Sequence, residues 1–155
     1  MNSDMRGAAV ADPFALYQIS TAHTPGGAAL RQAALDGELR ILVSAIAFTV
    51  SCSMRTCWDE DCRREHPGIP GHGVQDFHRQ HGFDIVQPTL ADSVSAGRLY
   101  SNLADHRFVG PEVLAACSAK LLADARNLPL LSTNRALYCY THLAGTADSP
   151  ALELV

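Results

Sequence analysis

The sequence predicts an α/β protein with three layers, in which a central, mostly parallel sheet of four to five strands has helices on both faces. Short apolar runs alternate along the chain with segments that have helical spacing, and this order favours parallel strands joined by crossover helices. The chain has 155 residues, of which 47% are hydrophobic and 18% charged. This composition is typical of one folded domain, so we expect a single domain spanning residues 1–155.

Five short apolar segments carry the strand prediction. Each has the length of a buried strand and is followed by a polar residue or a helix signal, except the last, which we expect to be an edge strand. The predicted strands cover residues 7–11, 40–43, 83–86, 130–131 and 151–155.

Capping residues mark where the helices between these strands begin and end. Proline follows Asp12 at a first helical position, and Gly110 is followed by proline in the same way. The run 24–27 is predicted to break the chain before a second helix at 28–36. Further helices are expected at 45–54, after residue 89, from 111 to 126 and at 135–143.

The helix from residue 111 and the strand after it point to a functional site. Apolar residues recur along this helix at three- and four-residue steps and predict one buried face, made of Leu114, Cys117, Leu121 and Ala125. In open α/β sheets, sites form at the carboxyl ends of the strands. Chemistry is therefore expected first in the segment 132–134, which reads Ser-Thr-Asn.

Charge and hydropathy exclude several classes of protein. The net charge is −4, and no run approaches the roughly 20 apolar residues that a membrane-spanning helix needs. The first residues have no long apolar core of the kind found in signal peptides. We therefore expect a cytoplasmic protein with no membrane partner, in which the five cysteines are reduced.

Four segments taken in order resemble a PIN domain, the fold of many bacterial toxin ribonucleases in toxin–antitoxin pairs. They are VADPFAL at 10–16, ILVSAIAF at 41–48, SVSAGRLY at 93–100 and the stretch RFVGPEVLAACSAKLLADARNLPLLSTNRALY at 107–138. The resemblance implies Mg²⁺ or Mn²⁺ held by acids at the sheet edge and RNA as the substrate. It also implies a protein partner and a homodimer.

The acids that the resemblance calls for are only partly present. Asp12 matches the first family aspartate, and Glu112 is the nearest match to the acid that opens the last long helix, unless that helix is aligned from its end, where Ala116 stands. Thr49 occupies the position of the family glutamate, and Asn134 that of the last aspartate. The resemblance thus implies Asp12, Glu112 and Asn134 as catalytic residues and Asp12 with Glu112 as weak metal ligands. The missing charges predict nuclease activity that is lost or strongly reduced.

Each of these residues also has a structural interpretation. Asp12 is a suitable helix N-cap, and Asn134 can cap the helix that follows. Glu112, in a first helical turn, interacts favourably with the dipole of its own helix. The alternative to lost activity is an active ribonuclease. Its site would contain Asp12, Glu112 and an acid from another position in the sequence, either Asp92 or Asp105.

The segment 52–81 is rich in cysteine and histidine and suggests a second alternative, a zinc-stabilised interaction module. Zinc takes four such ligands in a tetrahedron, and a set can be drawn from Cys57, Cys62, His66 and His81. The spacing contains no C-x₂-C knuckle. The competing interpretation places Cys52 in the core and the histidines on the surface, with Trp58 at a protein contact.

Overall fold

The computed structural model describes residues 7–22, 24–54, 72–104, 110–133 and 152–154. Its strands are β1 (Gly7–Ala11), β2 (Leu39–Ser44), β3 (Asp84–Val86), β4 (Leu130–Ser132) and β5 (Leu152–Leu154). The helices are α1 (Pro13–Thr21), α2 (Pro25–Leu35), α3 (Ala45–Ser53), α5 (His72–His81), α6 (Leu90–Ala104) and α7 (Pro111–Arg126).

The five strands form one sheet in the order β3-β2-β1-β4-β5, and every neighbouring pair is parallel. The chain moves outward from β1 through β2 to β3, then returns to the other side of β1 to form β4. The carboxyl ends of β1 and β4 therefore meet at the point where the strand order reverses, which is the usual site position in such sheets.

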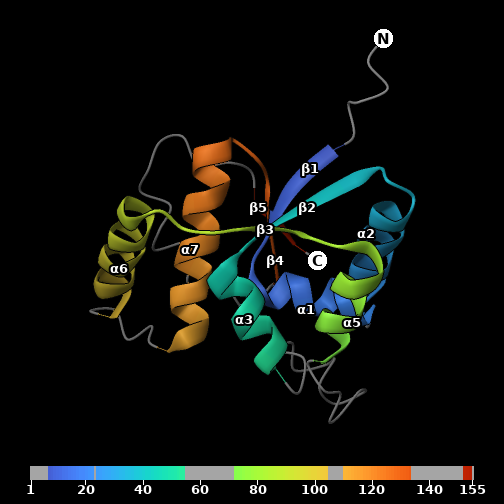
Figure 1. Ribbon diagram of the computed structural model, residues 1–155, viewed down its shortest axis with the longest axis horizontal. Helices are drawn as coiled ribbons and strands as arrows, with labels where there is room; N and C mark the ends of the chain where they lie inside the picture. Colours follow the sequence, from blue (N-terminus) through green and yellow to red (C-terminus); the bar gives the residue numbers. More distant parts are fainter. Residues whose placement is uncertain (1–6, 23, 55–71, 105–109, 134–151, 155) are drawn as a thin grey trace.

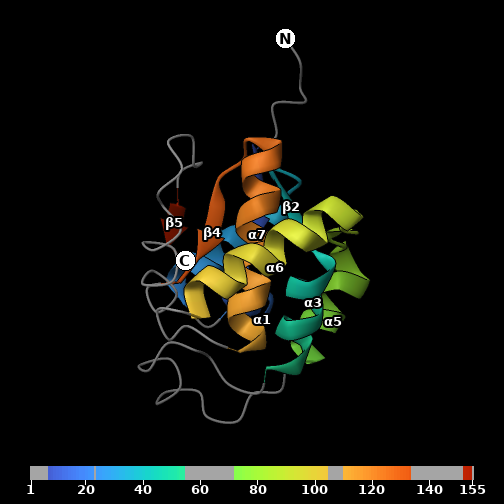
Figure 2. The same ribbon diagram turned by 90° about the vertical axis from the view of Figure 1, so that its left-hand side faces the viewer.

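Helices cover both faces of this sheet, as the sequence predicted. Figure 1 shows α7 and α6 on one side of the strands and α2 and α5 on the other, with α1 and α3 near the end where the strands finish. Figure 2, turned by 90°, places α6 and α7 in front of the sheet, with α6 outside α7. The predicted three-layer α/β fold with a parallel sheet of four to five strands is confirmed.

The core lies between the central strands and the helices that begin at their carboxyl ends. Strands β1 and β2 contribute Val10 and Val43, and α1 is buried along nearly its whole length, including Leu16 and Tyr17. Burial raises the pKa of the Tyr17 phenol above its ordinary value. Helix α1 is mostly apolar and lies inside the molecule, where its polar residues Gln18 and Ser20 are buried as well.

Two details of the sequence prediction are wrong. The second helix begins at Pro25 rather than at residue 28, because the Thr24 hydroxyl caps it by accepting a hydrogen bond from the Gly27 N–H at 3.0 Å. In α7 the buried residues include Ala115, Ala116, Ala119 and Ala123, whereas Leu121 is half-buried and Ala125 exposed. Small alanines let α7 approach the sheet closely, and its leucines at 114, 121 and 122 are only partly buried.

No helix in the described part of the chain is long and apolar enough to cross a membrane.

Candidate active site at the carboxyl edge of the sheet

Asp12 lies at the end of β1 and begins α1. Its backbone is extended, and its Oδ1 accepts a hydrogen bond from the Ala15 N–H at 2.7 Å, while Pro13 follows at the first helical position. This bond satisfies one of the N–H groups that a helix start leaves without an intrahelical partner. The N-cap interpretation of Asp12 is therefore confirmed.

The other carboxylate oxygen of Asp12 reaches across to the neighbouring strand. Oδ2 accepts a hydrogen bond from the hydroxyl of Ser132, the last residue of β4. The backbone N–H of Asp12 also donates to the Leu131 carbonyl at 3.1 Å. Side chain and backbone of one residue thus join the carboxyl ends of β1 and β4.

The hydrogen-bonded side chains of Asp12 and Ser132 are buried. Asp12 and Ser132 are both 0% exposed, and Thr133, which follows at the same edge, is 2% exposed. The Thr133 hydroxyl is buried and has no hydrogen-bond partner among the described residues. A buried carboxylate that accepts two hydrogen bonds is well placed to hold the fold together, because an unsatisfied buried polar group is costly.

Glu112 lies in the first turn of α7, which begins on the carboxyl side of the sheet (Figure 1). Its carboxylate bends back toward the start of its own helix: Oε2 would lie 2.7 Å from a Cβ atom built on Gly110. Gly110 has φ 119°, which is why glycine suits that position. A negative charge at a helix N-terminus is stabilised by the positive end of the helix dipole.

The position in α3 that matches the family glutamate carries no acid. The Thr49 side chain is exposed, and its hydroxyl donates to the Ala45 carbonyl one turn earlier at 2.9 Å. If α7 is aligned from its end, Ala116 takes the position of the family acid. Ala116 is buried, and its side chain has no oxygen to offer a metal. Asn134 lies outside the described residues.

These side chains do not suit the Mg²⁺ or Mn²⁺ that the PIN resemblance implies. Both cations take oxygen ligands, and Mg²⁺ usually keeps several waters beside one or two carboxylates. Asp12 has no exposed surface to offer a hydrated ion, and its oxygens already accept hydrogen bonds. Within the described ranges, no three His, Cys, Asp or Glu side chains gather as a set that could hold a metal. The described residues do not fit a nuclease metal centre.

The zinc alternative falls mostly beyond the described chain. Cys57, Cys62 and His66 lie outside the described residues, and His81 is exposed at the end of α5. Cys52 is half-buried and packs against the core, and burial raises the pKa of its thiol although a hydrogen bond with Gln75 lowers it in part. The zinc set stays a prediction.

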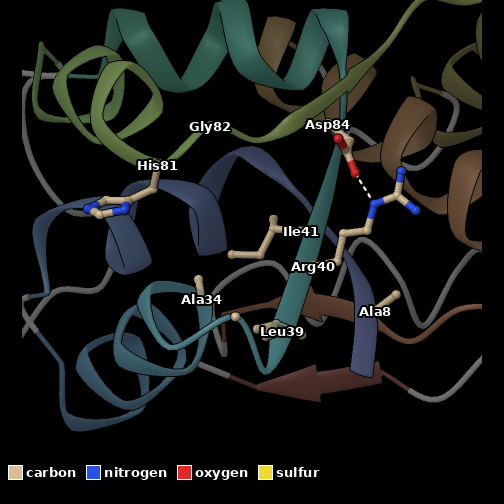
Figure 3. A pocket seen from close by; sticks show the side chains of 9 residues that line it. Ala8, Ala34, Leu39, Arg40, Ile41, His81, Gly82 and Asp84 are labelled. Carbon is tan, nitrogen blue, oxygen red and sulfur yellow. Dashed lines mark hydrogen bonds and ion pairs between the residues drawn. The ribbon is translucent and has the colours of Figure 1, made fainter. Parts of the chain in front are cut away.

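A separate hollow of about 420 Å³ lies near the start of β2, between the ends of α2 and α5 (Figure 3). Arg40 and Asp84 form an exposed ion pair on one side of it, and His81 lies on the opposite side. Exposed ion pairs contribute little to stability. Sequence reasoning missed this hollow, because its polar residues come from β2, α5 and β3 with no common motif.

Sequence reasoning also missed the ion pair of Lys120 with Asp124 inside α7, where Nζ lies 2.8 Å from Oδ2. The signal was available, since a lysine and an acid four residues apart lie on the same helix face. Lysine is usually exposed, whereas Lys120 is only 6% exposed.

Comparison with solved structures places this architecture in a known class. No protein-family model matches the sequence, and the curated proteins contain no match to it. The structure is similar to a chain in the crystal structure of VapBC2 from Rickettsia felis bound to a DNA fragment from their promoter. The TM-score is 0.56 at 13% sequence identity, and the match covers 96% of this chain and 98% of the other.

The chain therefore has a PIN-like fold, and the fold that the sequence resemblance implied is confirmed. At this level of identity the likeness concerns the fold alone.

Proposed function

We propose that this PIN-like protein is related to metal-dependent toxin ribonucleases, that its nuclease activity is lost or strongly reduced, and that it acts by binding RNA or another protein. The observation that carries the proposal is the state of Asp12. The position that matches the first catalytic aspartate is fully buried, and its carboxylate caps α1 and accepts the Ser132 hydroxyl.

The surrounding positions support the same conclusion. Thr49 and Ala116 carry no charge that could offset a divalent cation, and the carboxylate of Glu112 bends back to its own helix start. Two-metal phosphodiester cleavage needs several carboxylates that face one open site. We infer that the fold has been kept for binding while the acids of the reaction have been replaced.

The likeness to VapBC2, an assembly that was crystallised with DNA, supports a protein partner and contact with nucleic acid. A homodimer remains an expectation from the PIN resemblance. Size-exclusion chromatography with light scattering would give the oligomeric state directly.

The activity test compares purified wild-type protein with Asp12→Asn on structured and unstructured RNA, in Mg²⁺ and in Mn²⁺. Asparagine is also a good N-cap, so this variant removes the charge while keeping the helix start. Asp36→Asn serves as the matched control, because Asp36 is an exposed acid at the end of α2. We expect no cleavage above background for any of the three proteins.

Robust RNA cleavage that Asp12→Asn abolishes and Asp36→Asn leaves intact would overturn the proposal. It would favour the active ribonuclease with Asp12, Glu112 and a displaced acid. Of the two displaced candidates, Asp92 is exposed and accepts a hydrogen bond from Thr89 at 2.9 Å, and Asp105 lies outside the described residues. Calorimetry with Mn²⁺ gives an independent reading, for which we expect no binding heat at millimolar metal.

A further inference from the structure

In the described part of the sheet, β3 is shorter than β2, and the hollow beside the start of β2 lies where β3 does not reach. Strand β1 pairs with β2 from Leu39 onward, whereas β3 pairs with it only from Leu42, which is in register with Asp84. Among the described residues, the segment 39–41 therefore has a neighbouring strand on one side only. All three of its residues line the hollow of about 420 Å³, which we call the β2 slot.

The hydrogen-bond pattern of the sheet shows which backbone groups face this slot. The N–H groups of Val10 and Asp12 donate to carbonyls on the β4 side, at 2.9 and 3.1 Å. Backbone groups alternate in direction along a strand, so those of Ala9 face β2. In a parallel pair, the register partner of such a residue faces away from it, and the partner of Ala9 is Ile41. Ile41, and Leu39 two residues earlier, therefore direct their N–H and C=O groups toward the slot.

The side chains around the slot differ between the two faces of the sheet, because successive side chains of a strand point to opposite faces. Arg40 and Asp84 form their ion pair on one side of β2 (Figure 3). Ile41 points to the other side, where Ala34 lies at the end of α2, and the half-buried Leu39 adds apolar surface. A charged face and an apolar face suit an extended chain with alternating side chains.

Arg40 determines which charge fits the slot. Its side chain is 70% exposed and donates through Nε to Asp84, whose side chain is 43% exposed. That bond uses one of the five N–H donors of a guanidinium, so the fork can hold a second carboxylate. Asp84 is in register with Leu42 and is thus diagonal to Arg40. A residue of an added strand directly opposite Arg40 would lie closer to it, where an opposite charge stabilises the pair.

We propose that the β2 slot binds an extended segment of a protein partner, which adds to the sheet as a short strand beside Leu39 and Ile41. An acidic side chain of this segment lies opposite Arg40, and its neighbouring apolar side chains lie against Leu39 and Ala34. Added strands gain affinity from main-chain hydrogen bonds and specificity from alternate side chains. This inference rests on the protein-binding form of the proposed function and names a surface for the partner at the other end of the strands from Asp12.

The test uses a labelled, end-blocked hexapeptide of alternating valine and glutamate as the probe, with the full chain, and measures binding by fluorescence anisotropy. A second peptide has lysine in place of glutamate, and a third has proline in place of valine, which removes backbone N–H donors. We expect saturable binding of the valine–glutamate peptide and weaker binding of the other two. Equal affinity for all three, or no binding at millimolar peptide, would overturn the proposal.

Three variants connect this binding to the slot. Arg40→Gln should weaken binding of the valine–glutamate peptide by up to about fivefold, the range of one opposite-charge pair across a sheet. Asp84→Asn releases the guanidinium and should strengthen binding. Arg79→Gln is the matched control, because Arg79 is also exposed and paired, with Asp76 at 3.3 Å, but belongs to α5 and does not line the slot. Equal weakening by Arg40→Gln and Arg79→Gln would mean unspecific attraction and would exclude the slot.

Amide hydrogen exchange locates the bound peptide. The N–H groups of Leu39 and Ile41 should exchange more slowly with the valine–glutamate peptide, while the amides around Gly97 on α6 stay unchanged. Protection confined to other elements would rule out strand addition at β2. Light scattering tests a second copy as the occupant: a change of the monomer–dimer equilibrium in Arg40→Gln, with no competition by the peptide, would replace the partner segment by a second copy of this chain.

These results separate the inference from the proposed function. Absence of peptide binding overturns the slot and leaves the loss of nuclease activity standing. Metal-dependent RNA cleavage that is lost in Asp12→Asn overturns the proposed function, while opposite effects of Arg40→Gln and Asp84→Asn on peptide binding would still support the slot.

Discussion

The helices α1 and α6 begin in the same chemical way and have opposite surroundings. In α1, Asp12 caps a helix whose first eight residues are buried. In α6, Thr89 and Asp92 exchange hydrogen bonds across the first turn, at 2.9 and 3.1 Å, on a helix that is exposed along most of its length. One cap is part of the core, and the other lies in water.

This contrast separates the charged side chains that are buried from those that are exposed to solvent. The carboxylate at the edge where a PIN nuclease would work is used to join β1, β4 and α1. Charged groups that a ligand can reach lie elsewhere, for example Arg98 on α6 and the exposed ion pair of Arg40 with Asp84 on β2 and β3. The carboxylate of Asp12 therefore has a structural role, because it caps one element and accepts a hydrogen bond from another.

The largest effect is expected from Asp12→Ala. The change removes the cap of α1 and leaves the Ala15 N–H and the Ser132 hydroxyl buried without this acceptor. Loss of a cap and of a buried hydrogen bond predicts a fall in the free energy of unfolding of about 2–4 kcal/mol. Urea denaturation followed by circular dichroism measures it.

Asp12→Asn and Asp92→Ala give the comparison for this prediction. Asp12→Asn keeps a capping oxygen and should cost less than Asp12→Ala, while Asp92→Ala changes an exposed cap and should have a small effect. A loss below about 0.5 kcal/mol for Asp12→Ala, in the range of ordinary surface substitutions, would contradict a structural role for Asp12.

Two glycines test the same contrast in packing. A Cβ atom on Gly27, in the first turn of α2, would lie 2.6 Å from the backbone oxygen of Gln18 in α1. Gly27→Ala therefore forces α1 and α2 apart and should destabilise the protein by roughly 1–3 kcal/mol. The measurement is the same urea denaturation.

Gly97→Ala is the matched substitution on α6, where a Cβ atom would meet nothing within 4 Å. Alanine forms helix better than glycine does, so this change should stabilise the protein by up to about 1 kcal/mol. Effects of the same sign at both positions would show that the two helices do not differ in packing as described.

The sequence predicted the fold better than the site because the two depend on different information. Caps and apolar runs are local: Asp12 caps α1 as expected, Ser44 caps the start of α3, and Asn127 ends α7. The burial of Asp12 depends on contact with Ser132, which is 120 residues away along the chain, and no local pattern encodes it. The hollow beside Arg40 was missed for the same reason, because its lining residues come from separate elements.

The error in α7 has a related physical cause. Leucine spacing indicated one buried face, but burial follows the side where helix and sheet approach most closely, and alanines such as Ala116 and Ala119 permit that approach. Periodicity finds an amphipathic helix and cannot decide which of two neighbouring layers each apolar side chain will face. Helix α7 has neighbours on two sides, the sheet and α6 (Figure 2).

The smallest expected effect concerns the pH dependence of the exposed cap. Hydrogen bonds from the Thr89 backbone and side chain lower the pKa of Asp92 below its ordinary value. A carboxyl with a lower pKa in the folded state stabilises the fold above its unfolded-state pKa, and this contribution is lost as the pH falls through the folded-state value. Asp92→Asn removes it.

We therefore expect the melting temperatures of wild type and Asp92→Asn to differ slightly near neutral pH and to converge as the pH is lowered through the folded-state pKa of Asp92. Scanning calorimetry over this range measures the difference, and an NMR titration of the Asp92 carboxyl reports its pKa directly. A gap that widens toward acid pH would have the wrong sign, and would mean that Asp92 is not stabilised as an anion by the α6 cap.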